Sequence, residues 1–117
     1  MGQLDTNDLE ALMGDDPEFV GVFSRDSIPR GIDKRLSIKM IVNLDPKNLP
    51  GLHWVAISQR GGKAYYFDTF GRPPPKEISV WLSNNSLSWT YFKNVIQAPN
   101  DKVSCGYICL NFLNQLS

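Results

Sequence analysis

The sequence predicts an α+β fold in which a central β-sheet is flanked by helices. Segments with helical spacing of apolar residues stand at both ends of the chain, over 6–14 and 104–116. Between them lie several runs rich in β-branched and aromatic residues, separated by Gly, Pro, Asn and Asp. Two of these runs are joined by a Gly-Gly pair, which is typical of a hairpin turn.

Length, composition and charge limit the classes of function. The 117 residues predict one domain, 1–117, which is long enough to bury a core without metals or disulfides. Two cysteines and no basic-then-apolar leader favour a reducing, intracellular setting. Twelve basic and twelve acidic residues cancel, so we expect no nucleic-acid partner, and no apolar run reaches membrane-span length.

The first half of the chain predicts a helix followed by strands. In the helix over 6–14, Leu9, Leu12 and Met13 are expected to share one face. The stretch 19–26 fits either a strand or an irregular crossover, and 37–44 is β-rich and partly alternating, as in a strand.

Two further strands are predicted over 52–59 and 63–68, with a hairpin turn at 60–62. His53 opens the first of these strands and Asp68 closes the second. The hairpin therefore places an imidazole and a carboxylate at the same end of two paired strands.

The remaining elements alternate between helix and strand. We expect, in order, a stiff segment at 71–75, a helix through 77–82 that begins near Pro74 or Pro75, a polar loop at 83–88, a strand over 89–96 that ends at Gln97, and the terminal helix.

Cys105 and the sole histidine suggest a cysteine nucleophile with its base. Cys105 starts the terminal helix, where backbone N–H groups and the helix dipole lower a thiol pKa. His53 would take the thiol proton, and Asp68 would orient the imidazole. Gly106 leaves the backbone beside the sulfur uncovered, so that a substrate carbonyl can approach. We interpret Cys109, one turn further on, as a small buried apolar residue.

Gln97 offers a side-chain N–H₂ group to an oxyanion, with the Cys105 backbone N–H as the second donor. Each of these residues also has an ordinary structural interpretation when taken singly: His53 as an edge-strand residue, Asp68 as a turn former, Gln97 as a loop entrance. We expect no metal site, because one His and two Cys at i, i+4 do not make one.

In these residues the chain resembles adenain, the adenovirus maturation protease, and the related proteases of Polinton/Maverick elements and adintoviruses. The most specific matches are Ile41-Val42-Asn43, Gly51-Leu52-His53-Trp54, Tyr66-Phe67-Asp68-Thr69-Phe70-Gly71, Gln97-Ala98-Pro99-Asn100 and Ser104-Cys105-Gly106-Tyr107. The resemblance implies a papain-like cysteine protease fold of the adenain type, with a central mixed sheet. It also implies the same catalytic roles for His53, Asp68, Cys105 and Gln97.

The resemblance extends to substrate and cofactors. Adenain has Glu where Asp68 stands, whereas ubiquitin-like-protein-specific proteases of the same clan use Asp. In that branch the Trp after the histidine roofs a tunnel for a Gly-Gly tail, so Trp54 is a candidate substrate contact, with core packing an equal alternative. The family admits an activating peptide or DNA. This chain lacks adenain's basic surplus and the cysteine that binds its peptide, so we expect no cofactor.

Together these observations predict a monomeric cysteine endopeptidase. It would cleave viral or transposon-encoded capsid precursors after small, Gly-rich sites, in the host nucleus or cytoplasm or packaged in the virion. One alternative is a deubiquitinase-like protease that removes ubiquitin-like modifiers. Another is a catalytically silent protein-binding module. An acyltransferase with the same residues is a third.

Overall fold

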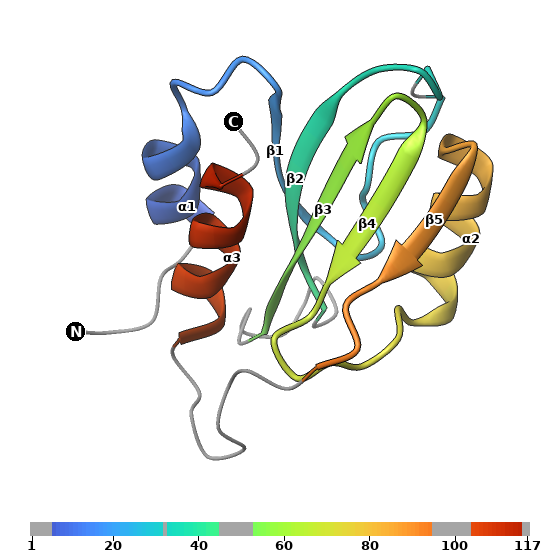
Figure 1. The fold of residues 1–117 in the computed structure, drawn as a ribbon. Coiled ribbons are helices and arrows are strands. Elements are labelled where there is room, and N and C mark those ends of the chain that lie inside the picture. Colours follow the sequence, from blue (N-terminus) through green and yellow to red (C-terminus); the bar gives the residue numbers. More distant parts are fainter. Residues whose placement is uncertain (1–5, 32, 45–52, 95–103, 116–117) are drawn as a thin grey trace.

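A mixed sheet of five strands separates two hydrophobic cores in the computed structural model of the chain (Figure 1). The structure describes residues 6–31, 33–44, 53–94 and 104–115, with only the backbone described at residues 6, 104 and 105. The elements are, in order, α1 (Thr6–Met13), β1 (Phe19–Ser24), β2 (Ile38–Asn43), β3 (Trp54–Arg60), β4 (Lys63–Phe67), α2 (Lys76–Asn85), β5 (Ser88–Tyr91) and α3 (Ser104–Asn114).

The strands lie side by side in chain order, β1-β2-β3-β4-β5. The outer pairs, β1 with β2 and β4 with β5, are parallel, while β2-β3 and β3-β4 are antiparallel. The hairpin between β3 and β4 is confirmed, and its turn is Gly61-Gly62, with φ of 55° and 82°. Positive φ at both residues is what a type I′ turn requires, and glycine adopts it without a steric penalty.

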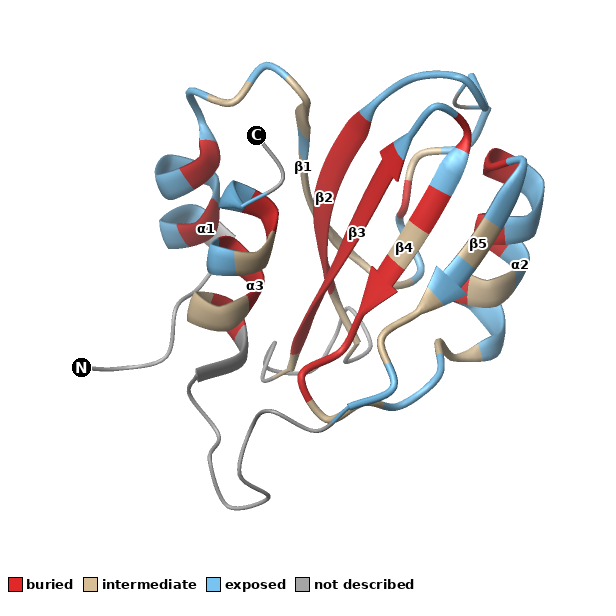
Figure 2. Cartoon of the chain, in the orientation of Figure 1, coloured by how far each residue is buried: buried red, intermediate tan, exposed pale blue. Residues whose placement is uncertain are grey.

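Helices cover both faces of the sheet. In Figure 1, α1 and α3 lie together on one side and α2 lies on the other. Successive residues of a strand point to opposite faces, so Ile41 of β2 joins the core under α1 and α3, whereas Met40 and Val42 join the core under α2. Figure 2 shows β2 and β3 buried along most of their length, as central strands covered on both faces should be.

The structure decides one open alternative and corrects three predictions. The stretch 19–26, left open above, contains strand β1, whose register against β2 has one irregularity near its start. Leu12, predicted on the apolar face of the first helix, is 60% exposed. Helix α2 runs to Asn85, through part of the predicted polar loop at 83–88. Its last turn is held by the Ser86 backbone N–H, which donates to Leu82 O at 3.1 Å, and by the Asn85 side chain, which donates to Trp81 O at 2.9 Å. Strand β5 ends at Tyr91 rather than continuing over 89–96, and the next residue, Phe92, packs its ring 5.0 Å from that of Phe67.

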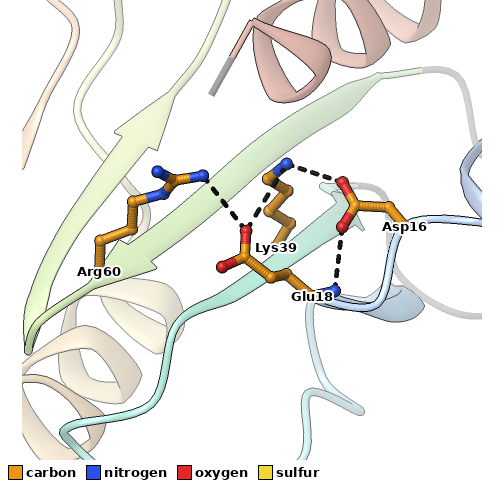
Figure 3. Close-up of polar contacts among 4 residues, drawn as sticks. All are labelled: Asp16, Glu18, Lys39 and Arg60. Carbon is orange, nitrogen blue, oxygen red and sulfur yellow. Dashed lines mark hydrogen bonds and ion pairs between the residues drawn. The ribbon is translucent and has the colours of Figure 1, made fainter. Parts of the chain in front are cut away.

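A buried lysine pins the turn between α1 and β1 to the sheet (Figure 3). Lys39, near the start of β2, is 1% exposed, and its ammonium lies 2.7 Å from Asp16 Oδ2 and 3.7 Å from Glu18 Oε1. Arg60, at the end of β3, reaches the same Glu18 oxygen at 3.2 Å. The hydrogen bond from Lys39, followed by that from the Glu18 backbone N–H, lowers the pKa of Asp16 below 3.8.

Candidate active site

His53 and Asp68 meet at one end of the sheet. His53 immediately precedes β3 and Asp68 immediately follows β4, and the antiparallel pairing of these strands aligns Ala56 with Phe67. His53 Nε2 lies 3.0 Å from Asp68 Oδ1. The prediction that the hairpin brings these two side chains together is therefore confirmed.

The Asp68 carboxylate is buried and held by its own turn. It is 1% exposed, and Oδ1 accepts the Phe70 backbone N–H at 2.8 Å while the Asp68 carbonyl accepts that of Gly71 at 2.8 Å. Arg72 places Nε 3.8 Å from Oδ2. An aspartate that accepts the N–H two residues later forms an Asx-type turn. The turn after β4 therefore holds the Asp68 carboxylate in place independently of its contact with His53.

The His53 imidazole is packed on one face and partly open to solvent. Its ring stacks on Phe70 with centroids 5.0 Å apart and 30° between the planes, and the side chain is 16% exposed. The guanidinium of Arg72 lies 4.8 Å from the centroid of the same Phe70 ring. When Nε2–H donates to Asp68, the tautomer leaves Nδ1 as the nitrogen that can accept a proton.

A second buried polar group lies near the pair. Tyr66, two residues before Asp68 on β4, is fully buried, and among the described residues its hydroxyl has no hydrogen-bond partner. Burial, and after it the negative charge of Asp68, raises the pKa of Tyr66. The Tyr66 phenol therefore stays neutral and adds no negative charge near the Asp68 carboxylate.

Helix α3 begins where the sequence places the thiol. Cys105 is its second residue, so its backbone lies in the first helical turn, where N–H groups have no intrahelical acceptor. Its side chain is outside the described residues, as is the whole of Gln97. Gly106, the next residue, is buried. The expected helix position of Cys105 is confirmed, and the sulfur and the Gln97 amide remain predictions.

Cys109 and Trp54 tie α3 to the strand that follows His53. Cys109 is fully buried, as interpreted from the sequence, and its thiol donates to Trp54 O at 3.4 Å. Trp54 is 2% exposed and belongs to the core between the sheet and α3. The packing alternative for Trp54 is thus what the structure shows, and contact with substrate stays a prediction.

Sequence reasoning missed Phe70, Arg72 and Tyr66. The alternation of β4 carried a signal for Tyr66, because residues two apart on a strand share a face and Tyr66 therefore shares one with Asp68. Phe70 and Arg72 follow the strand in a turn, where side chains have no regular periodicity. Their contacts, Phe70 with the imidazole and Arg72 with the carboxylate, are therefore visible only in the folded structure.

Two classes of feature are missing from the described ranges. No group of three or more His, Cys, Asp or Glu side chains there is arranged to hold a metal ion. In the same ranges, none of the helices is both long and apolar enough to cross a membrane.

Comparisons with known proteins match this architecture. No family model matches the chain. In an alignment 88 positions long that covers 65% of the chain, the sequence is 33% identical to R355, a candidate thiol protease of Acanthamoeba polyphaga mimivirus, and the match covers 28% of that protein. The fold is similar to two crystal structures of the ASFV pS273R protease, one of them the Se-Met form, with TM-scores of 0.69 and 0.63 and identities of 16% and 17%.

These structural matches cover 98% of the chain but only 57% and 58% of the two protease chains. The chain thus spans little more than half the length of the protease that it resembles in structure, and under a third of its relative in sequence. The likeness establishes the fold. The chain has the papain-like cysteine protease fold that the sequence predicts, with a mixed sheet and flanking helices.

Proposed function

We propose that the chain is a cysteine endopeptidase domain with Cys105 as nucleophile and His53 as general base. Asp68 orients the imidazole, and Gln97 donates to the oxyanion. The observation that carries the proposal is the 3.0 Å contact between His53 Nε2 and the buried Asp68 Oδ1 at one end of the sheet. The likeness in fold to a viral protease supports the same assignment.

In the proposed reaction, His53 Nδ1 takes the proton from Cys105 Sγ, and the thiolate attacks the scissile carbonyl carbon. The oxyanion accepts hydrogen bonds from the Cys105 backbone N–H and the Gln97 amide. As the intermediate collapses, the C–N bond breaks and the imidazolium returns its proton to the leaving amine. Water then cleaves the thioester, with His53 again accepting a proton, and the free thiol is restored.

For the substrate we propose capsid precursors, cut after small residues at Gly-rich sites, as in adenain-type proteases. The support is the set of motifs shared with those proteases and the viral origin of both relatives found by comparison. Trp54 and Gly106 are the proposed contacts for the small residue before the scissile bond. The proposed enzyme acts as a monomer without a metal or other cofactor, inside the host cell or the virion.

The test is covalent labelling of the purified protein by two electrophilic probes, a peptide ending in Gly-Gly and a whole ubiquitin-like modifier. Mass spectrometry would locate the adducts in the wild type, Cys105→Ala and His53→Ala. We expect the peptide probe to label Cys105 in a reaction that depends on His53. Cys109 is the internal control, because it is a buried thiol on the same helix and should stay unlabelled.

Other outcomes separate the alternatives. Preference for the whole modifier would indicate a protease for ubiquitin-like modifiers. Absence of labelling, even after addition of candidate capsid-derived peptides as activators, would indicate a silent binding module. Equal labelling of Cys105 and Cys109 would contradict an activated nucleophile.

A further inference from the structure

A hollow of about 690 Å³ lies on the α2 side of the sheet, between α2 and the segment 25–31 that leaves β1. Volumes of this order suit bound ligands or peptide side chains. Its lining residues are Arg25, Asp26, Ile28, Arg30, Gly31, Glu77, Val80, Trp81, Asn84 and Asn85. Figure 1 shows α2 on the face of the sheet away from α1 and α3, so the hollow is separate from the α3 contact.

The two walls are fixed to each other. The Trp81 indole N–H donates to Pro29 O at 2.7 Å, which holds the segment 25–31 against α2. Ile28 and Trp81 are almost fully buried and form an apolar floor. Val80, on the same side of the helix, is 49% exposed. A preformed hollow with an apolar floor binds a ligand without the entropy cost of ordering its walls.

The acidic and basic side chains that line the hollow differ in the interactions they make within the protein. Asp26 Oδ1 accepts the Ser24 hydroxyl at 2.8 Å, and Glu77 lies in the first turn of α2, where the helix dipole favours a carboxylate. Neither Arg25, which is half-buried, nor Arg30 forms an ion pair with any residue that the structure describes. Arg25 and Arg30 can therefore pair with a carboxylate of a bound segment, which guanidinium groups bind in a bidentate manner.

The hollow also lies near the catalytic pair. The Arg25 backbone N–H donates to Asn43 O at 2.9 Å, and the Leu44 N–H donates to His53 O at 3.0 Å, so Arg25 and His53 lie at the same end of the sheet, two strands apart. Two strand spacings are about 10 Å, which an extended peptide covers with about three residues. A peptide bound at the catalytic pair can thus reach the hollow.

We propose that this hollow is a second substrate-binding site for an extended segment that carries an acidic residue beside an apolar one. The acidic side chain pairs with Arg25 and Arg30, and the apolar side chain covers Ile28, Val80 and Trp81. A dense polyanion such as nucleic acid fits less well, because Asp26 and Glu77 also line the hollow and would repel it. The proposal rests on the proposed protease function in one respect, namely that the bound segment belongs to a protein substrate of the protease.

The test measures binding rather than cleavage. Fluorescence anisotropy would follow labelled peptides of repeating Gly-Leu-Glu, Gly-Leu-Gln and Gly-Leu-Lys on the Cys105→Ala chain, so failed catalysis cannot be confused with failed binding. We expect the Glu peptide to bind about tenfold more tightly than the Gln peptide, since charge-assisted hydrogen bonds exceed neutral ones by about that factor. The double change Arg25→Gln and Arg30→Gln should remove the difference.

Two further variants complete the test. Arg35→Gln removes the same charge from a side chain that is 84% exposed and outside the hollow, and it should bind the Glu peptide as the unchanged chain does. Val80→Asp adds a negative charge at an exposed helix position, where the fold should tolerate it, and it should weaken the Glu peptide by about tenfold.

Three results would overturn the proposal. The Glu peptide could bind no better than the Gln or Lys peptide. The double arginine variant and Val80→Asp could bind as the unchanged chain does. Inorganic polyphosphate could displace the labelled Glu peptide as well as unlabelled Glu peptide does, or better, when both are compared at the same concentration of negative charges. That result would indicate a site for polyanions.

Discussion

Each end of the sheet holds a pair of polar side chains with one buried member, and the two pairs differ in what they can do. At one end His53 lies 3.0 Å from Asp68, and the histidine side chain keeps 16% of its surface exposed. At the other end Lys39 lies 2.7 Å from Asp16 and is only 1% exposed. Imidazole groups in general can exchange a proton near neutral pH, which is why histidine serves as a general base, and lysine side chains are less suited to that role.

The contrast indicates a division of labour. The His53 side chain is partly exposed, as the proposed proton transfer requires, whereas the buried Lys39 and its partners join three segments of the fold. Removing a member of the first pair should cost activity more than stability, and removing a member of the second should do the reverse. Four predictions test this division, from the largest effect to the smallest.

The first prediction concerns Asp68→Asn. Asp68 Oδ1 contacts both the Phe70 N–H and His53 Nε2, so an asparagine oxygen in its place keeps both contacts but lacks the negative charge that stabilises the imidazolium. In the flipped orientation the asparagine N–H₂ meets His53 Nε2 and favours the wrong imidazole tautomer. We expect the rate of Cys105 labelling by the Gly-Gly probe to fall by about a hundredfold or more.

Lys39→Met is the control for this experiment, and it should label at the wild-type rate. Labelling of Asp68→Asn at the wild-type rate would mean that Asp68 only shapes its turn.

The second prediction concerns Asp16→Ala. The change removes the carboxylate nearest to the buried Lys39 ammonium, at 2.7 Å, and keeps the Glu18 carboxylate at 3.7 Å, so we expect the free energy of unfolding to fall by about 2 kcal/mol. Lys39→Met removes the buried charge itself and leaves carboxylates that water can reach, so it should cost less than Asp16→Ala. Urea unfolding of both variants measures the difference. Equal losses would contradict the view that the cost lies in an unpaired buried charge.

The third prediction compares two glycines at opposite ends of the sheet. Gly71, in the turn after Asp68, has φ of 71°, and a Cβ there would lie 2.7 Å from Asn94 O. Gly61, in the hairpin turn, has φ of 55° but no atom within 4 Å of an added Cβ. Gly71→Ala should therefore destabilise the fold by about 1–2 kcal/mol and Gly61→Ala by about 1 kcal/mol or less.

Labelling of Cys105 gives a second readout for the two glycine variants. Gly71→Ala moves the turn that holds the Asp68 carboxylate, so it should also slow labelling, and Gly61→Ala should not. Equal labelling rates would show that the turn after β4 tolerates displacement without loss of the catalytic arrangement.

The sequence predicted the end of the sheet with His53 and Asp68 better than the opposite end, for a physical reason. His53 and Asp68 belong to one hairpin, and a Gly-Gly turn between alternating strands fixes their relation locally. The pairing of Lys39 with Asp16 joins residues 23 apart in the chain. It depends on how the α1–β1 turn folds over β2, and the individual residues look like an ordinary solvated surface.

The sequence predicted the ends of α2 and β5 wrongly for a related reason. The end of β5 and the extension of α2 are set by Phe92 packing on Phe67 and by Asn85 donating to Trp81 O, both of which are tertiary or capping contacts. The hollow beside α2 was equally invisible, because it exists only where residues 25–31 meet a helix about fifty positions later. Local periodicity says which residues form an element, and it does not say which elements meet.

The last prediction separates the two ends by pH. The pKa of Asp16 is lowered in the folded protein, so in acid the unfolded chain takes up this proton before the folded one. The stabilisation from Asp16 is complete above the ordinary value of 3.8 and is lost as pH falls below it. The difference in unfolding free energy between the wild type and Asp16→Asn should thus be constant near neutral pH and shrink in acid.

The catalytic end should respond in another pH range. The rate of Cys105 labelling should change near neutral pH, where imidazole groups titrate, under conditions in which the Asp16 contribution to stability is constant. Urea titrations and labelling rates measured on the same samples would compare the two ranges. A labelling rate that falls only where the protein unfolds would show that both ends serve stability alone, and the division of labour between them would be wrong.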